Sequence, residues 1–278
     1  MKQLFDSSSY NCSRLVTRAY STSFSKAITL LAPSIRPAIY AIYGYVRYAD
    51  EIVDTFDGYN QSELLLEFEE NYEKALKRRI SMNPILNAFQ EVVHQYRLYD
   101  LVHSFMDSMK MDLYKSEYTT AEEYADYIYG SADVVGLMCL KVFVKGDEKH
   151  YEELRPSAMR LGSAFQKVNF LRDYKDDVEG LGRSYFPNLK NTYLDNDTKR
   201  EIIKDIEADF AEAYKGVVQL PMEARLGVYL AYRYYKRLLQ ELKVADSKRI
   251  RKERIRINNL LKLEILVESY LRYKINAI

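Results

Sequence analysis

The sequence NFLRDYKDDVEGLGRSYFP, residues 169–187, has a pattern that core packing alone does not explain. Asn169, Asp173 and Asp177 recur every fourth residue, which places their side chains on one face of a helix over two turns. Like charges at this spacing repel each other by roughly a few tenths of a kcal/mol. A cation held by oxygen ligands reverses that cost, and Mg²⁺ is the usual cation where phosphates supply the other ligands.

A second pair of carboxylates occurs in YVRYADEIVDTF, residues 45–56. Asp50 and Asp54 are again four residues apart, and the sequence before them, AIYGYV, is strongly apolar. A helix that is apolar on most faces is buried, and an unpaired carboxylate is costly to bury there. Two acidic helix faces far apart in the chain therefore predict a site between facing helices of a bundle.

Carboxylates at this spacing also arise by chance, because the chain contains 40 acidic residues. Glu201, Asp205 and Asp209 repeat the spacing of the first motif and serve as an internal control. Lysines and an arginine surround them in the sequence, whereas apolar residues surround the other two motifs. We therefore expect the control run to be a solvated face with balanced charges.

The composition is ordinary for a soluble globular chain: of 278 residues, 47% are hydrophobic and 29% are charged. Glycine (10) and proline (6) are scarce, which favours long helices over many short strands. The net charge of +1 gives no field that would attract nucleic acid. There is no secretory signal pattern and no apolar run near the ~18 residues of a membrane span. We expect a cytoplasmic protein.

The spacing of apolar residues predicts a single all-α domain over residues 1–278. Residues 1–9 are expected to form a polar lead, and residues 57–61 a loop. A break in the helix 122–143 is expected at Gly130 and Gly136. The expected helices are 10–31, 37–56, 62–80, 84–96, 98–113, 122–143, 151–174, 199–214, 225–242 and 255–273.

The sequence gives weaker support for other kinds of functional site, such as a zinc site, a disulfide or a nucleotide site. His94, His103 and His150 lack the spacing of zinc ligands, so we expect structural or surface roles. Cys12 and Cys139 imply no disulfide framework and are expected to be small buried apolar groups. The sequence has no glycine-rich nucleotide loop and no nucleophile elbow, so no nucleotide cofactor is expected.

Two segments are each compatible with more than one role. The hydroxyls of Ser21, Thr22 and Ser23 in YSTSF are typical of a helix cap or bend, but they could also donate hydrogen bonds to an anion. The segment 243–256 contains seven Lys or Arg residues and would ordinarily be a solvated face. Two alternatives remain open: Arg254 turns inward to an anion, or the stretch rests on anionic lipid.

In its motifs the chain resembles the squalene/phytoene synthase family. RYADEIVD resembles the first aspartate-rich motif, RxxDDxxD, with Glu51 at the second aspartate. LGSAFQKVNFLRDYKDDVEGLGRSYFP resembles the second motif, with Asp176 where the family often has Glu. YSTSF resembles the early serine segment, and YIYGSADVVGLM resembles the pattern YxxxVAGxVG, with Asp133 in place of Gly. The resemblance covers roughly residues 14–270.

The resemblance implies an all-α isoprenoid-synthase fold around an apolar cavity, and 1′–1 condensation of two prenyl diphosphates. Mg²⁺ is the implied cofactor, with Mn²⁺ as the alternative. Carried over by motif, the implied metal ligands are Asp50, Asp54, Asn169, Asp173 and Asp177. The implied diphosphate-binding residues are Arg47, Arg172, Arg183 and Arg254, with Ser21 and Ser23. The residues implied near the reacting carbons are Tyr43, Tyr129, Tyr185, Tyr235 and Gln166.

The missing nucleotide fingerprint favours proton loss to phytoene over reductive closure to squalene. The resemblance, which is greatest to bacterial phytoene synthases, thus implies condensation of two geranylgeranyl diphosphates to phytoene in carotenoid biosynthesis. The alternatives are a C30 synthase that makes squalene, hydroxysqualene or dehydrosqualene from farnesyl diphosphate, a non-catalytic helical assembly protein, and a terpene cyclase. We expect surface contact with the inner membrane face and no nucleic-acid partner; the oligomeric state stays open.

Overall fold

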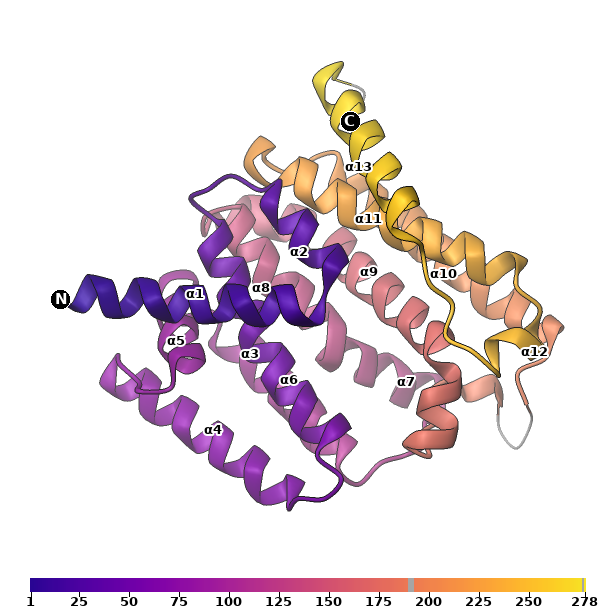
Figure 1. Ribbon diagram of the computed structural model, residues 1–278, viewed down its shortest axis with the longest axis horizontal. Helices are drawn as coiled ribbons and strands as arrows, with labels where there is room; N and C mark the ends of the chain where they lie inside the picture. The colour runs from indigo at the N-terminus through magenta and orange to yellow at the C-terminus, as the bar shows by residue number, and fades with distance from the viewer. Residues whose placement is uncertain (190–192, 277) are drawn as a thin grey trace.

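The computed structural model describes residues 1–189, 193–276 and 278. This part of the chain is helical (Figure 1), and its only β pairing is an isolated bridge between Glu117 and Ser184, which confirms the predicted all-α class. The elements are α1 (Lys2–Tyr20), α2 (Thr22–Thr29), α3 (Arg36–Thr55), α4 (Gln61–Arg78), α5 (Pro84–Tyr96), α6 (Tyr99–Asp112), α7 (Ala121–Ile128), η1 (Tyr129–Asp133), α8 (Val134–Phe143), α9 (Glu148–Arg172), η2 (Asp176–Gly180), η3 (Pro187–Leu189), α10 (Asn196–Val217), α11 (Met222–Val244), α12 (Ser247–Ile250) and α13 (Asn259–Lys274). None of the helices in these ranges is long and apolar enough to cross a bilayer.

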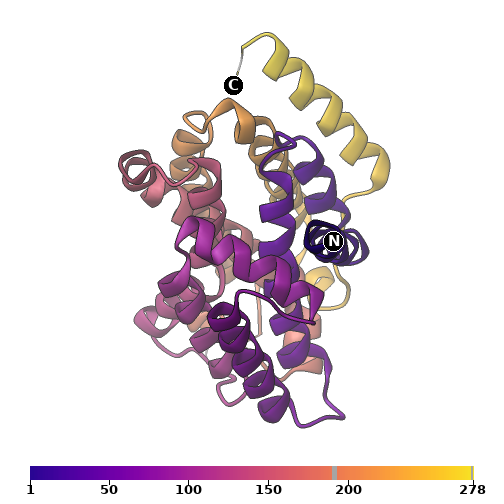
Figure 2. The same cartoon turned by 90° about the vertical axis from the view of Figure 1, so that its left-hand side faces the viewer.

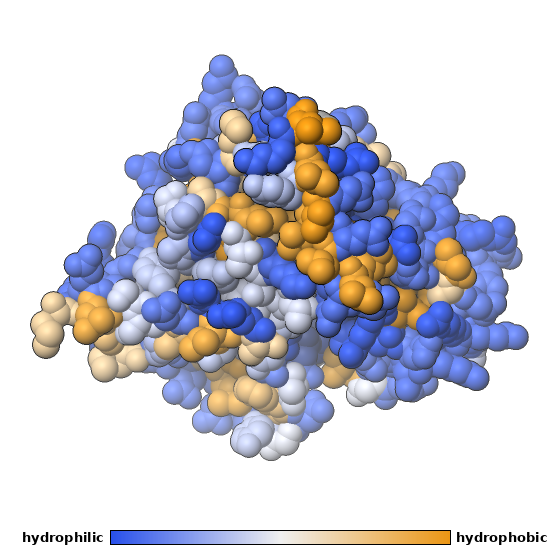
Figure 3. All heavy atoms as spheres, turned by 45° about the horizontal axis from the view of Figure 1, so that its top comes forward, coloured by the Kyte–Doolittle hydropathy of each residue, from blue (hydrophilic) through white to orange (hydrophobic). Residues whose placement is uncertain are grey.

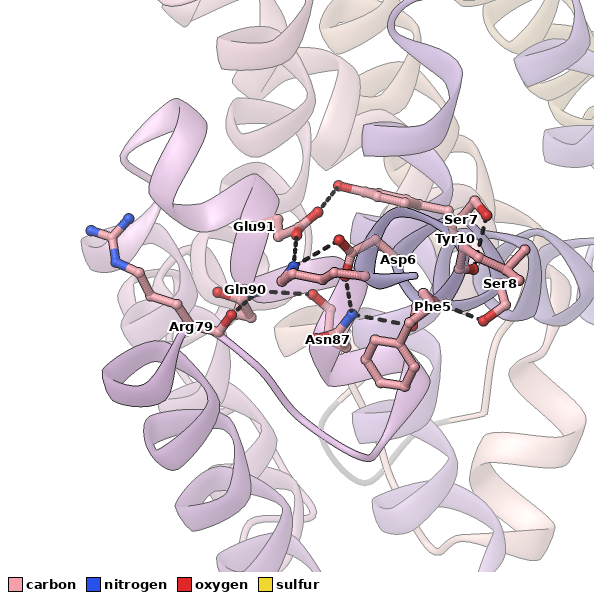
Figure 4. A network of polar contacts seen from close by, with 12 residues as sticks. Phe5, Asp6, Ser7, Ser8, Tyr10, Arg79, Asn87, Gln90 and Glu91 are labelled. Atoms are coloured by element: carbon pink, nitrogen blue, oxygen red, sulfur yellow. Dashed lines mark hydrogen bonds and ion pairs between the residues drawn. The ribbon is translucent and has the colours of Figure 1, made fainter.

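The expected polar lead at residues 1–9 is wrong, because α1 begins at Lys2 and packs on α3 and α5. Figure 4 shows the contacts to α5: the Tyr10 hydroxyl donates to Glu91 at 3.2 Å, and the amide of Asn87 donates to Asp6 at 3.2 Å. The buried side chains of α1 are Ser9, Ser13 and Thr17. Apolar periodicity cannot reveal a helix that buries small hydroxyl side chains, which is why the prediction failed.

The expected helix 10–31 divides at Ser21, which has an extended backbone. Its side-chain oxygen accepts a hydrogen bond from the Phe24 N–H at 3.1 Å and caps α2. This confirms the helix-cap interpretation of the YSTSF segment.

Two apolar cores flank the centre of the molecule, one built mainly from α3–α6 and α8, the other mainly from α9–α11. In the first, Tyr45 is fully buried and stacks on Phe89 with ring centroids 4.0 Å apart. In the second, Phe170 stacks on Tyr185 at 3.9 Å. Tyrosine supplies large apolar area in both cores, which accounts for its abundance in the sequence.

The predicted interruption at Gly130 is confirmed as the π-helical turn η1 between α7 and α8, whereas the one predicted at Gly136 is wrong, because Gly136 lies inside the α-helix α8. This turn lies directly against α9. A Cβ atom at Gly162 would be 2.9 Å from the Cα of Asp133, a distance that no side chain tolerates. Glycine at position 162 therefore allows η1 and α9 to approach backbone to backbone.

The control run is a solvated face only in part: Glu201 and Asp205 are exposed, as predicted, but Asp209 is buried. Asp209 is 3% exposed and accepts hydrogen bonds from Lys167 at 2.7 Å and Arg160 at 2.9 Å, both on α9. Lys199 is also buried, and its ammonium group donates to the last carbonyls of α11, including that of Lys243 at 3.1 Å. The prediction failed because the partners of these charges lie on other helices and not nearby in sequence.

Asp133 lies beside this cluster and accepts a hydrogen bond from the Ser163 hydroxyl at 2.8 Å. Burial raises its pKa to about 7, against the opposing effect of the Ser163 hydrogen bond. Because the folded state holds a proton that the unfolded state releases near pH 4, stability is lost as the pH rises from about 4 to about 7.

We therefore expect Asp133→Asn to stabilise the fold above pH 7 and to change little near pH 4, below which the folded and the unfolded state both hold the proton. The gain at pH 8.5 should be about 2–4 kcal/mol, since each pKa unit corresponds to about 1.4 kcal/mol. Urea unfolding at both pH values measures it. The exposed Asp126→Asn serves as the control and should leave both values unchanged. An equal effect of Asp133→Asn at both pH values would contradict the account.

Candidate active site

A cavity of about 440 Å³ runs between α2, α3, α8, α9 and α11, within the usual size of ligand pockets. On α9 it is lined at every turn, by Leu154, Ser157, Ala158, Leu161, Gly162, Phe165, Gln166 and Asn169. Leu154 and Asn169 are 15 residues apart (169 − 154), which at 1.5 Å per residue is about 22 Å of helix. The cavity is thus long and follows α9.

The two ends of the cavity differ in chemistry. At the α9 end near Asn169 the walls carry Arg47, Asp50, Arg172 and Arg254. Towards Leu154 they become apolar, with Ile39, Phe143 and Leu220 among the lining residues. Cys139 also lines this deeper part. Cys139 and Cys12 both pack against the first apolar core, but they are half-buried, so the expectation of small buried apolar groups is confirmed only in part. We refer to the charged end as the mouth.

The first acidic motif projects from the C-terminal half of α3. Burial raises the pKa of Asp50 to about 8, and the neighbouring charge of Asp54 adds to this shift. Glu51 forms an ion pair with Arg47, whose guanidinium also lies over the Tyr20 ring, 4.5 Å from its centroid. The helix spacing therefore directs Asp50 and Asp54 together, while Glu51 neutralises the arginine.

In the second acidic motif, Asn169, Asp173 and Asp177 follow one another at helical spacing, as predicted, but they do not lie on one straight helix. Backbone hydrogen bonds run from the Asp173 N–H to the Asn169 carbonyl and from the Asp177 N–H to the Asp173 carbonyl. The helix nevertheless ends at Arg172, and the chain then passes through the π-helical turn η2. Burial, followed by the charges of Asp173 and Asp54, raises the pKa of Asp177 to about 8.

The two motifs meet through Arg183, which is buried. Its Nη1 donates to the Asp54 carboxylate at 2.6 Å, although the two residues are 129 positions apart. Its Nη2 donates to the carbonyls of Val53 and Asp112, both at 3.0 Å. The two acidic motifs thus lie on facing elements at one end of the cavity.

Asp173 is held by two arginines. Arg172 donates to its carboxylate at 2.8 Å from Nε, and the Nε of Arg254 lies 2.8 Å from the same oxygen. Of the roles left open for segment 243–256, Arg254 therefore takes the inward one. Arginine forks bind carboxylate and phosphate oxygens alike, so a diphosphate could replace these contacts.

The carboxylates at the mouth fit a hard divalent cation. The charge of Asp54 contributes to the raised pKa values of Asp50, Asp112 and Asp177, and all four side chains are oxygen donors. No group of three or more His, Cys, Asp or Glu side chains within the described ranges forms a closed metal cage. Mg²⁺ that is bound together with phosphates takes only one or two carboxylates.

Two features of the mouth were missed by the sequence analysis. Lys262, at the start of α13, donates to the Thr22 hydroxyl at 2.8 Å. Burial and then the charges of Lys26, Arg172 and Arg256 lower its pKa, a crowding of cations that an anion would relieve. The N-terminus of α2 lies at the same place and also favours an anion. No motif marks Lys262 in the sequence.

The second feature of the mouth that the sequence analysis missed is Asp112. In the sequence it is recognisable only as an acidic residue at the end of an apolar helix. Burial raises its pKa to about 7. One carboxylate oxygen accepts from the Tyr127 hydroxyl at 3.0 Å, and the other has no hydrogen-bond partner in the part of the chain that the structure describes. Its carbonyl holds Arg183, so it helps to fix the guanidinium that joins the motifs.

The aromatic and amide residues implied by the resemblance occupy three places. Tyr43, Tyr235 and Gln166 line the cavity, and the Tyr235 hydroxyl donates to the Asn169 side chain at 3.2 Å. Tyr185 lies in the aromatic stack beside Arg183. Tyr129 lines a different pocket, between α7, α9 and α10. Of the two serines, Ser21 lines the cavity and Ser23 is not among its lining residues.

Comparison with known sequences gives a consistent result. A profile of squalene/phytoene synthases matches residues 17–260. A 15-cis-phytoene synthase from Synechocystis is 29% identical over 96% of this chain and 86% of the relative. Chloroplastic phytoene synthases from Narcissus pseudonarcissus (29%, 92% of this chain) and Daucus carota (30%, 83%) are covered over 64% and 62% of their length. The chain thus spans less than two thirds of these plant relatives.

Solved structures show the same fold. A dehydrosqualene synthase crystallised with a ligand superposes with a TM-score of 0.82 at 19% identity, over 97% of this chain and 98% of the other. A squalene synthase from Alicyclobacillus acidocaldarius gives 0.72 at 22% identity, over 84% and 92%. These structures share the fold, and the profile match over most of its length shows that the chain belongs to the squalene/phytoene synthase family of prenyltransferases.

Proposed function

We propose that the chain condenses two geranylgeranyl diphosphates 1′–1 (head to head) to phytoene, through a cyclopropyl diphosphate, as a step of carotenoid biosynthesis. The length of the cavity, from its charged mouth to its apolar end, carries the choice of substrate. An extended geranylgeranyl chain spans roughly 19 Å and a farnesyl chain roughly 14 Å at C–C bond lengths near 1.5 Å. The channel of about 22 Å along α9 fits the longer chain.

The mouth is suited to bind and ionise an allylic diphosphate. Arg47, Arg172 and Arg254 line it and are placed to bind diphosphate oxygens, with Arg183 behind them between the motifs. Asp50, Asp54, Asn169, Asp173 and Asp177 would hold Mg²⁺, which when bound neutralises the charge of the departing diphosphate. Fixed positive charge at the leaving group lowers the barrier to breaking the C1–O bond.

The walls behind the mouth are suited to a carbocation. Phe24, Phe165 and Tyr235 pack against one another, and Phe165 stacks on Tyr235 with ring centroids 4.0 Å apart. Aromatic faces stabilise positive charge and exclude the water that would quench it. Burial raises the pKa of Tyr43 to about 12, so that its hydroxyl keeps its proton. We therefore assign Tyr43, Tyr235 and Gln166 to positioning the reacting carbons.

Removal of the metal should abolish the reaction without unfolding the protein. We expect EDTA to lower diphosphate release by at least about 10²-fold, since electrostatic stabilisation of this kind contributes that much. Mg²⁺ should restore the release, with Mn²⁺ as the alternative. Melting curves give an independent readout: Mg²⁺ with inorganic diphosphate should raise the melting temperature more than either alone.

The decisive experiment offers the purified protein farnesyl and geranylgeranyl diphosphate separately, with Mg²⁺ and detergent and without NADPH. Phytoene supports the proposal. A C30 product would assign the chain to the farnesyl-using branch of the family instead. Release of diphosphate from neither substrate by the folded protein would favour a non-catalytic assembly role.

We further propose that residues 1–278 form one functional domain that works in the cytoplasm, touching the inner membrane face to take up substrate and release product. The two apolar cores support this, because Val228 on α11 packs against both of them.

A further inference from the structure

The outward face of α13 is apolar, the reverse of an ordinary surface helix. The exposed side chains are Leu260, Leu263, Val267, Tyr270, Leu271 and Ile275, which we call the α13 ridge. Their exposed fractions range from 44% for Tyr270 to 80% for Leu260. Figure 3 shows a continuous apolar ridge flanked by hydrophilic residues on the face that carries α13.

The exposure of the ridge does not result from a loose attachment of α13 to the rest of the molecule. The opposite face of the helix buries Ile265 and Ser269 and packs on α11 around Leu230 and Tyr234. The Tyr234 hydroxyl donates to the carbonyl of Lys262 at 3.0 Å, which fixes the start of the helix. Figure 2 shows α13 along the outer edge of the molecule. The helix therefore has one packed face and a second apolar face that the described residues of the chain leave uncovered.

The segment just before α13 is strongly basic. Lys248, Arg249, Lys252 and Arg256 are four exposed residues of this segment; Arg254 is also solvent-accessible but pairs with Asp173 at the mouth. Of the exposed four, Arg249 has an acidic partner, Glu253. An apolar helix face beside uncompensated lysines and arginines is the combination that binds the surface of an anionic bilayer.

The α13 ridge lies close to the mouth of the cavity. α13 begins at the mouth, where Lys262 contacts Thr22 and Arg254 contacts Asp173. A bilayer on the ridge would lie beside the opening through which an apolar tail must pass. This part of the argument rests on the proposed function, because only a lipid-like substrate needs such a route.

We propose that the α13 ridge and the exposed residues of segment 248–256 form a docking surface for a bilayer with anionic headgroups. The apolar side chains enter the boundary between headgroups and acyl chains, and the basic residues contact the headgroups. The mouth is thereby placed next to the membrane, from which the tails reach the cavity.

The test is flotation of the full chain with vesicles in the absence of substrate. Vesicles of phosphatidylcholine with about one third phosphatidylglycerol should bind the protein, pure phosphatidylcholine much less, and 1 M salt should release it. Leu263→Asp with Val267→Asp should reduce the partition coefficient at least tenfold. Lys248→Gln with Lys252→Gln should reduce it by about fivefold for each charge removed.

Matched controls use exposed residues on other faces. Leu15→Asp with Leu66→Asp, and Lys77→Gln with Arg78→Gln, should bind vesicles as the unchanged protein does. Melting curves verify that each variant is folded, and all variants should keep their turnover in detergent. Since flotation uses no substrate, its result is independent of the proposed reaction.

Three results would overturn the proposal. The unchanged protein could stay unbound with anionic vesicles, or the folded ridge variant could float as well as its control. Alternatively, sedimentation without vesicles could show a dimer that the ridge variant abolishes, while neither protein binds vesicles. That last result would assign the ridge to a second copy of the chain.

Discussion

Asp50→Asn should lower diphosphate release by about 10²–10³-fold while leaving the protein folded and at least as stable as before. The carboxylate lies with Asp54 at the mouth, where burial and like charge make it costly for the fold. An asparagine keeps the shape of the side chain but removes its negative charge. That buried charge is favourable only when a cation is bound beside it. A residue kept for stability would show the opposite pattern.

Two measurements test this prediction together: the rate of diphosphate release under saturating substrate and Mg²⁺, and the melting temperature without Mg²⁺. Asp57→Asn is the matched control, because Asp57 follows the same helix but is exposed. It should change neither quantity. A large fall in the melting temperature of Asp50→Asn, with activity reduced in proportion to unfolding, would refute the catalytic assignment.

Cys139→Phe should change the preferred substrate from the C20 to the C15 diphosphate. Gly136, one turn earlier on α8, lies against Ala158 of α9, since a Cβ there would be 3.1 Å from the Ala158 carbonyl oxygen. α8 and α9 are joined by a short turn, so Cys139 lies deeper, towards Leu154. A phenyl ring at this position would obstruct the last part of the channel.

With geranylgeranyl diphosphate, we expect phytoene formation by this variant to fall more than about tenfold, as the strain of overpacking is about 1–3 kcal/mol. With farnesyl diphosphate, formation of a C30 product should be maintained or increased. Cys139→Ala is the control and should still make phytoene. Equal losses with both substrates in a folded variant would show that the channel does not select chain length here.

Much of the architecture follows from the sequence because long apolar-periodic segments leave few options. The α3 helix and its acidic end could be predicted from AIYGYV followed by Asp50 and Asp54, and the contact of Arg183 with Asp54 agrees with facing motifs. The predictions that failed concern residues whose interaction partners lie far away in the sequence. Asp209 was taken for a surface charge because its cation, Lys167, lies on another helix.

The mouth was predictable only in part, for the same reason. Asp50 and Asn169 stand in long motifs, whereas Lys262 has no local signature and acts through its place beside α2. Likewise, periodicity did not distinguish the tyrosines that line the cavity from Tyr129, which lines another pocket. Their roles stay predictions that substitution must test.

The buried ammonium group of Lys199 has a consequence for how the chain reaches the mouth. By holding the terminal carbonyls of α11, it sets the direction in which the backbone leaves that helix. The same stretch then delivers Arg254 to Asp173 and leads into α13. A substitution of Lys199 is therefore expected to displace both Arg254 and the start of α13, although Lys199 itself contacts neither.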